Sequence, residues 1–429
     1  MRGAQPGRRW TLVPQWFGSI AFEHRTARYF PFDREITRML EGAISTPIDL
    51  EAIEPHRREA VVAFLDEFYP RGMFTVDLRF DGVRAPVEPL QQTLSAPLVT
   101  HLEVNSVCNI ECVHCFAGKL PRKERTLDLR ELDALFCDMA SMGAMRLALS
   151  GGEPLMRKDL FELIDCAIGH DLRTSLVTNG LLLDDAIVRS LAARDLLWLS
   201  VSLDGATATT NDAIRGAGTF DRVLERVALL RGRVPFSLAM TVTSTNHHEA
   251  AAFSALARDV GASGAVLRPM YPAGLGRDRL DLVPSFRQYR EALAALAEDA
   301  VEEGHCDTPA RYGPDERAID SADVVGHLGC GAATTLAAIS ASGTVSPCSF
   351  LGAEYDGPSV RERPFSSIWR EAHVFETLRA PEALASFDGG CRARSKAITG
   401  SAFAPDPWLS SSEERALDPL VTLRVRRDR

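Results

Sequence analysis

Six short apolar runs between residues 99 and 300 constrain the fold of this chain more than any other feature. Longer amphipathic segments of helical period separate them. A strand followed by a helix, repeated in this way, is typical of a parallel sheet covered by helices. Six units are too few to close an eight-stranded barrel, so we expect an α/β fold with a partial (β/α)6 TIM-like barrel. The runs are VTHLEV, MRLALS, RTSLVT, LLWLSVSL, FSLAMTV and GAVLRP.

The chain is too long for one ordinary domain, and we expect further units on both sides of the barrel. Strand-like and helical patterns alternate before residue 95, including a strand over 73–82, and indicate a small winged-helix-like α+β domain. After residue 300, LAAISASGTVSPCSFLG predicts a hairpin turned at Ser342–Gly343. The expected units are 1–95, the barrel at 96–300, a C-terminal domain at 301–410 and a tail at 411–429.

Composition excludes several classes of protein. The formal charge of −10 argues against a broad surface for nucleic acid. No apolar run is long enough for a membrane span or a signal peptide, so we expect a cytoplasmic protein without membrane contact. Cytosolic thiols stay reduced, and clustered cysteines among the nine therefore indicate a metal site or catalysis.

Polar or glycine-rich loops follow the first four predicted strands. They are Cys108–Cys115, SGGEP at 150–154, TNG at 178–180 and SLDG at 202–205. In βα folds the chemistry lies where the strands end, so we expect these loops to meet on one rim of the barrel.

Cys108, Cys112 and Cys115 have the spacing C-x3-C-x2-C. A structural zinc site needs four ligands, normally as two separated pairs. His114 could be a fourth ligand, but its position beside Cys115 points it away from the same metal. A four-iron cluster held by three thiolates, with one iron left free, is the better interpretation.

These residues resemble the radical S-adenosylmethionine (SAM) superfamily over about 97–300. The resemblance implies that SAM binds the free iron and is cleaved reductively to a 5′-deoxyadenosyl radical. It also implies SAM contacts by Gly151, Gly152 and Glu153 in GGEP, by Phe116, Asn179, Ser202 and Asp204, and by Arg215. Three of these have an alternative: a surface turn for GGEP, a turn residue for Asn179, and core packing for Phe116.

A second group of cysteines resembles the SPASM/twitch extension of this superfamily, which carries an auxiliary iron-sulfur cluster. Cys330, Gly343 and Cys348 match its opening, and GGCRARSKAITG supplies Cys391. The pattern is incomplete, because Arg379, Glu382 and Asp388 stand where relatives have cysteines. We expect one auxiliary cluster, its fourth site open or filled by Cys306, Asp323 or His327. Cys137 and Cys166 lie in helical patterns and are interpreted as core thiols.

The attached domains direct the choice of substrate. The N-terminal domain resembles the recognition elements of peptide maturases, which bind a leader peptide as an added strand; a structural cap is the alternative. We therefore expect a radical SAM enzyme that modifies a ribosomally synthesised precursor peptide, favouring a crosslink, with flavodoxin or ferredoxin as electron donor. The alternatives are peptide epimerisation, tetrapyrrole side-chain chemistry of the haem pathway, and a non-enzymatic metal-binding scaffold.

Overall fold

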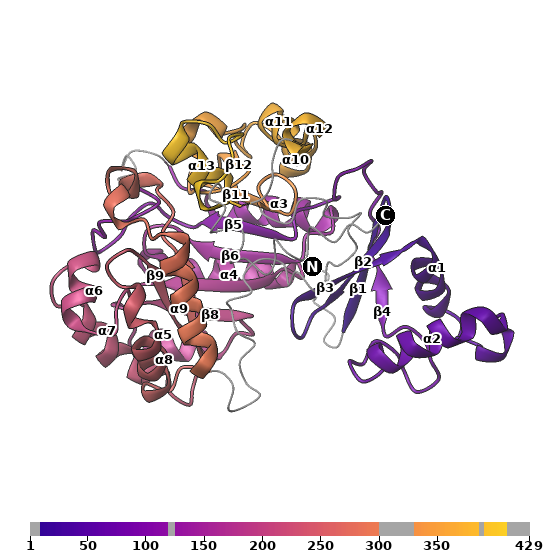
Figure 1. The fold of residues 1–429 in the computed structure, drawn as a ribbon. Coiled ribbons are helices and arrows are strands. Elements are labelled where there is room, and N and C mark those ends of the chain that lie inside the picture. Colours follow the sequence, from indigo (N-terminus) through magenta and orange to yellow (C-terminus); the bar gives the residue numbers. More distant parts are fainter. Residues whose placement is uncertain (1–8, 119–124, 300–329, 386–389, 410–429) are drawn as a thin grey trace.

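The structure, a computed structural model, describes residues 9–118, 125–299, 330–385 and 390–409 (Figure 1). Its central feature is an eight-stranded sheet in the order β10-β9-β8-β7-β6-β5-β11-β12. The first six strands are parallel, which confirms the predicted partial barrel. The strands are β5 (Val99–Glu103), β6 (Arg146–Ser150), β7 (Arg173–Thr178), β8 (Trp198–Ser202), β9 (Ser237–Val242), β10 (Gly264–Pro269), β11 (Leu336–Ile339) and β12 (Val345–Ser346).

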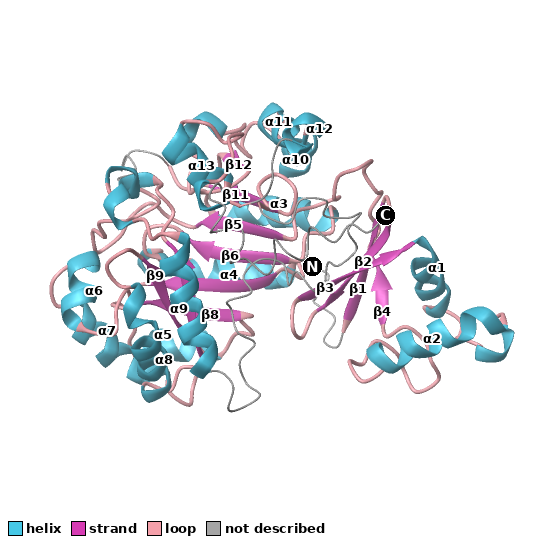
Figure 2. Cartoon of the chain, in the orientation of Figure 1, coloured by secondary structure: helices cyan, strands magenta, loops and turns pink. Residues whose placement is uncertain are grey.

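Helices follow the parallel strands and cover the outer face of the sheet (Figure 2). The first of them, α3, begins at a capping box in which Asp128 and Glu131 each accept from the other's backbone. It buries Leu132, Leu135 and Met139, one stripe at helical spacing. The helices of the barrel are α3 (Leu129–Ser141), α4 (Leu160–Gly169), α5 (Asp185–Ala192), α6 (Ala208–Arg215), α7 (Thr219–Val227), α8 (Ala250–Asp259) and α9 (Phe286–Asp299).

The two faces of the barrel strands differ in polarity. Leu102 and Leu149 are buried in the same apolar core as the helices. His101, Glu103 and Arg146 alternate with such residues along β5 and β6, and therefore face the inner side of the barrel. A parallel sheet covered on both faces is apolar throughout. The polar inner face therefore fits a barrel that leaves room for polar ligands.

The N-terminal region forms a separate four-stranded sheet in the order β3-β2-β1-β4 (Figure 1). One face packs under its two helices around Trp10 and Phe30, and the other packs against the linker and the barrel around Val13 and Met145. This explains why β1 and β2 are buried along their whole length. The elements are β1 (Trp10–Gln15), β2 (Gly18–Glu23), β3 (Arg28–Asp33), α1 (Arg34–Ala43), α2 (Pro55–Phe68) and β4 (Gly82–Arg84).

One predicted strand of this region is displaced. The alternating residues 73–82 form turns and an isolated bridge between Phe74 and Phe80, and the strand begins only at Gly82. Met73, Phe74 and Phe80 fill the core beside α2 and Leu78 packs against it, whereas Val76 is exposed. The alternation of apolar residues therefore does not correspond to a strand paired in the sheet.

The C-terminal region extends the barrel sheet. β11 adds to β5 in parallel and turns back into β12 through Gly343, as the predicted hairpin requires. Gly343 has a φ of +95°, which favours glycine. In the described part of this region the α-helices are α10 (Phe365–Glu371), α11 (His373–Arg379), α12 (Pro381–Ala385) and α13 (Arg392–Thr399). Among the described helices, none combines the length and the apolar character that crossing a bilayer requires.

Candidate functional site

The three cysteines of the first group lie together at the carboxyl end of β5. The thiol of Cys112 is close enough to Cys108 and Cys115 for their charges to influence it. Burial raises the pKa of the Cys112 thiol to about 12, and the Arg215 guanidinium opposes this shift. Three neighbouring thiols beside a cation are suited to a metal cluster, since a bound metal takes the place of their protons. These residues therefore fit the cluster that the sequence predicts.

The glycines of GGEP hold the cysteine loop in place. The Gly152 N–H donates to Asn105 O at 2.9 Å, and the Glu153 N–H donates to Val107 O at 2.7 Å. A Cβ at Gly152 would lie 2.1 Å from Val107 O, and one at Gly151 would lie 2.4 Å from Asn105 O. The glycines thus admit the protein's own backbone, where we predicted the approach of a ligand.

Glu153, predicted as a SAM contact, accepts hydrogen bonds within the chain. Its side chain is buried and accepts from Thr178 Oγ1 at 2.6 Å, Leu155 N at 3.0 Å and Asn179 N at 2.7 Å. Burial raises its pKa, and these hydrogen bonds oppose the shift. Because both carboxylate oxygens are engaged within the chain, Glu153 joins the loops after β6 and β7.

Asn179 combines the two roles considered for it. Its Oδ1 accepts from Leu181 N at 3.0 Å, which is a turn contact. Its Nδ2 donates to Asn109 Oδ1 at 2.7 Å and lies 3.8 Å from Cys108 Sγ. The TNG loop therefore contacts the cysteine loop directly.

Asp204 is the centre of a buried ion pair and not an exposed ligand contact. Its Oδ2 lies 2.7 Å from both His114 Nε2 and Arg215 Nε, and its Oδ1 accepts from Thr241 N at 2.7 Å. The carboxylate has no exposed area, and Arg215 and His114 hold its pKa far below the ordinary value despite the opposing effect of burial. Asp204 thereby anchors the cysteine loop through His114, a role that the sequence analysis missed.

The two remaining predicted residues lie at the rim. Ser202 ends β8, half-buried, and its hydroxyl has no hydrogen bond within the part of the chain that the structure describes. Phe116 packs edge-on against Phe350, at 5.2 Å between ring centroids. Phe350 in turn stacks on Tyr271 at 4.6 Å. These three rings connect the first cysteine loop with the segment that follows Cys348.

The second group of cysteines comes together from three segments. The pKa values of Cys348 and Cys391 are raised mainly by burial, and each thiol feels the charge of Cys330. Cys391 precedes α13, and its N–H donates to Asp406 Oδ2. Asp406 is fully buried and pairs with Arg394, so it holds the backbone at Cys391 in place. Because the three thiols are near enough to influence one another's charge, they fit a second cluster.

Two of the residues that stand where the full SPASM pattern has cysteines lie in the described part of the chain: Arg379 and Glu382. Arg379 donates to Ala333 O and Trp369 O, both at 2.6 Å, and its guanidinium lies 4.1 Å from the Trp369 ring. Glu382 is exposed to solvent. A cation on an aromatic ring thus occupies a position where relatives have a thiolate. Asp388 and the three candidate fourth ligands, Cys306, Asp323 and His327, lie outside the described residues.

Glu103 is a further site residue that the sequence analysis missed. It ends β5 on the inner face, and its charge influences Cys115. Burial, with the charge of Asp356, raises the pKa of Glu103 to about 7. Burial lowers the pKa of the neighbouring His101 to about 4, and nearby arginines add to this shift. The alternation of residues along β5 was the sequence signal that could have placed Glu103 on the inner face of the barrel.

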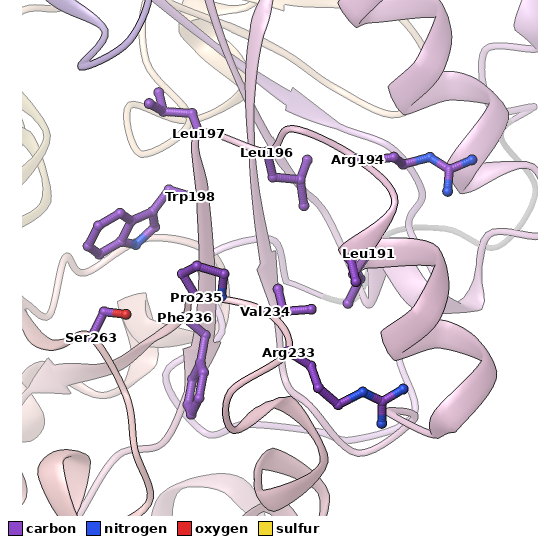
Figure 3. A pocket seen from close by; sticks show the side chains of 11 residues that line it. Leu191, Arg194, Leu196, Leu197, Trp198, Arg233, Val234, Pro235, Phe236 and Ser263 are labelled. Atoms are coloured by element: carbon purple, nitrogen blue, oxygen red, sulfur yellow. The ribbon is translucent and has the colours of Figure 1, made fainter.

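One pocket lies far from this rim. It opens where β8 begins and just before β9, and Trp198, Phe236 and Arg194 contribute to its lining (Figure 3). This is the amino end of the parallel strands, opposite the cysteine loop. The chemistry of the barrel is therefore not located in this pocket.

Comparisons with known proteins agree with the geometry. The family description "Radical SAM superfamily" matches residues 102–256. An AdoMet-dependent heme synthase of Methanosarcina barkeri is 33% identical over 342 residues, covering 73% of this chain and 96% of that protein. Mycofactocin maturase MftC of Mycolicibacterium smegmatis is 31% identical over 343 residues, covering 75% and 84%.

A solved structure extends the likeness to the remaining regions. SuiB of Streptococcus suis, bound to precursor peptide SuiA, has a TM-score of 0.66 at 15% identity. The match covers 95% of this chain and 99% of that chain. At this coverage it includes most of the N-terminal sheet as well as the barrel.

Proposed function

The chain belongs to the radical SAM superfamily, and we propose that within this family it modifies a ribosomally synthesised precursor peptide. As a member of the family it is an enzyme that uses a four-iron, four-sulfur cluster and SAM. We favour formation of a crosslink as the modification. The observation that carries the peptide proposal is the position of β3 at the edge of the N-terminal sheet, where, within the described residues, β2 is its one partner strand.

Cys108, Cys112 and Cys115 are proposed to hold the cluster. When bound, the cluster and SAM supply a radical able to take a hydrogen atom from an unactivated carbon. Among the protein's own residues, Arg215 places a positive charge beside the thiolates, and Asp204 fixes both Arg215 and His114.

The N-terminal sheet offers an edge for an added strand. Within the described residues, β3 pairs with β2 on one side only. Pro31 lies in this strand, and a proline on an edge strand turns its nitrogen away from the partner strand. The backbone groups of Tyr29, two residues earlier, then face the same open side. A leader peptide adding here would pair with Tyr29 and with the carbonyl of Pro31.

The comparisons support the same substrate class. MftC is named as a maturase, and SuiB was solved with its precursor peptide. The curated relatives leave about a quarter of this chain unmatched, whereas the SuiB fold covers nearly all of it. The N-terminal sheet is therefore a reason to prefer a peptide to a small molecule.

We propose that Cys330, Cys348 and Cys391 hold an auxiliary cluster that accepts an electron. A crosslink requires the loss of an electron after the first hydrogen atom is taken, and a nearby cluster can receive it. The rings of Phe116, Phe350 and Tyr271 fill the space between the two cysteine groups. Flavodoxin or ferredoxin is proposed as the donor for the first cluster.

Tetrapyrrole chemistry is the second candidate. It is favoured by one observation, the 33% identity to an AdoMet-dependent heme synthase. Such a substrate gives the edge of β3 no role. Peptide epimerisation would need a thiol as hydrogen donor, and Cys306, the candidate for it, lies outside the described residues.

The test uses the anaerobically reconstituted protein, a reductant, SAM and the peptide encoded by a short reading frame beside the gene. We expect 5′-deoxyadenosine and a peptide mass lower by two hydrogen atoms. A protein in which Cys108, Cys112 and Cys115 are replaced by Ala is the matched control and should give neither. Formation of 5′-deoxyadenosine with Fe-coproporphyrin and not with peptide would favour the second candidate.

Strand addition can be tested without changing the protein. Single N-methyl groups placed along a synthetic leader remove one backbone donor at a time. Because alternate amides of a strand face its partner, affinity should fall at every second position. A loss without this period of two would contradict pairing with β3.

A further inference from the structure

We propose that Asp133, Cys166 and His170 form a binding site for a zinc-like divalent cation on the outer surface of the barrel. Asp133 lies on α3, and Cys166 and His170 lie at the end of α4. Asp133 Oδ1 is 2.8 Å from His170 Nε2 and 3.3 Å from Cys166 Sγ. The site is on the helical face of the sheet, whereas both other cysteine groups lie at strand ends or in the C-terminal region.

The positions of these residues on α3 and at the end of α4 bring the three ligand atoms close together before any cation binds. Cys166 and His170 are one turn apart on α4, so their side chains share a face. The three ligand atoms all lie within 4.8 Å of one another. Zinc binds sulfur at about 2.3 Å and nitrogen or oxygen at about 2.0 Å, so a cation among them requires only small side-chain movements. No other three such side chains among the described residues gather this closely.

The hydrogen bonds within the group converge on one carboxylate oxygen. The Cys166 thiol donates to Asp133 Oδ1 at 3.3 Å. The thiol and His170 thus place two donors on one carboxylate oxygen. A divalent cation would displace the thiol proton and receive sulfur, nitrogen and oxygen together, a set of ligands that zinc accepts.

A fourth ligand is available on α3. Cys137 lies one turn beyond Asp133, so the two helices carry the pairs D-x3-C and C-x3-H. Cys137 is exposed, so the prediction that it is a core thiol was wrong, whereas Cys166 is half-buried and packs against the apolar core. Ala140, the next residue on this side of α3, lines the same hollow as His170, which places this stripe of α3 beside the end of α4. The Cys137 thiol is not among the ligand atoms that lie within 4.8 Å of one another, so we expect binding through Asp133, Cys166 and His170, with Cys137 joining as a fourth ligand only after its side chain moves.

The experiment measures zinc in protein whose iron-sulfur sites are fully loaded. The reconstituted chain is incubated anaerobically with Zn²⁺, passed through a desalting column with a weak chelator, and analysed for zinc and iron by mass spectrometry. We expect about one zinc per chain in the wild type. Cys166→Ser and His170→Ala should each bind Zn²⁺ at least tenfold more weakly, with the iron content unchanged.

Two further variants sharpen the result. Cys137→Ser should weaken binding without abolishing it, because water can replace one ligand. His373→Ala removes an exposed histidine from α11 and should change nothing. Because zinc would join α3 to α4, it should raise the melting temperature of the wild type and of His373→Ala but not of Cys166→Ser.

Three results would overturn the proposal. The first is wild-type protein without zinc after the column. The second is equal zinc in wild type and Cys166→Ser. The third is zinc that rises only as iron falls, which would place it on the cluster cysteines.

Discussion

The two cysteine groups of the cluster sites are built in opposite ways. Cys108, Cys112 and Cys115 share one loop, whereas the second group comes from three segments: Cys330 precedes the β11–β12 hairpin, Cys348 follows it and Cys391 precedes α13. Each group nevertheless has a buried carboxylate paired with an arginine, Asp204 with Arg215 and Asp406 with Arg394. Asp204 reaches its loop through His114, and Asp406 accepts directly from the Cys391 backbone.

The difference shows how each site depends on the rest of the fold. The first site needs one loop held in shape by its neighbours, and four successive strand ends supply them. The second site exists only if distant segments are brought together. Changes to either set of cysteines, to the anchoring carboxylates and to the supporting loops should therefore have different and separable effects.

The largest expected effect is on iron content and SAM cleavage when one of the two cysteine groups is removed. Replacing Cys108, Cys112 and Cys115 by Ala should abolish 5′-deoxyadenosine formation and lower iron from about eight to about four per chain. Replacing Cys330, Cys348 and Cys391 should remove the other four and leave SAM cleavage in place. Iron and sulfide counts with electron paramagnetic resonance measure both. If the first variant kept its activity, the assignment of the two sites would be wrong.

The next effect compares the anchoring carboxylates. Asp204→Asn and Asp406→Asn each leave a buried arginine without its charged partner, which costs about 3–5 kcal/mol of unfolding free energy. Denaturant titration measures this cost. Each variant should lose mainly the iron of its own site.

Asp195→Asn provides the control for this pair. Asp195 pairs with Arg173 but is 79% exposed, so its loss should cost less than about 1 kcal/mol. Equal costs for all three variants would mean that the buried pairs have no special role.

A third prediction concerns the support of the first loop. Gly152→Ala places a methyl group 2.1 Å from Val107 O, and the overlap should cost about 1–3 kcal/mol and lower the iron of the first site alone. Gly169→Ala, at the end of α4, meets no atom within 4 Å and should be neutral. Unchanged SAM cleavage in Gly152→Ala would contradict the supporting role of the glycine.

The smallest expected effect is a pH dependence at the first site. The folded-state pKa of Glu103 is raised to about 7, so folded protein binds more protons than unfolded protein between pH 4.5 and 7. Unfolding free energy should therefore fall as pH rises through this window, and stay level on either side. Allowing for solvent screening, the change should be about 1 kcal/mol.

The matched variant for this measurement is Glu103→Gln, which cannot ionise. Denaturant titrations of loaded protein at pH 5 and pH 8 should show the difference in wild type and not in this variant. An identical pH response in both proteins would assign the effect to another group, such as Asp356, whose charge reaches Glu103.

The sequence predicted the positions of the site loops better than the roles of their residues. Strand alternation and the C-x3-C-x2-C spacing placed the cysteine loop at the end of β5, because both patterns are local. Glu153 and Asp204 were predicted as SAM contacts, and the structure adds that both have partners within the protein, Thr178 and Arg215. The sequence pattern of a carboxylate in a loop is the same whether that carboxylate binds a ligand or accepts a hydrogen bond from the protein's own backbone.

The sequence by itself determined the alternation of strands and helices in the barrel, the partial barrel and the family. These follow from periodicity and short spacings, which depend on neighbouring residues. Only the tertiary structure decided which polar groups meet across long separations: His114 with Asp204, Cys391 with Asp406, and Asp133 with Cys166 and His170. Such pairs form because different strand ends and helix faces are brought together by packing, and no local pattern records that distance.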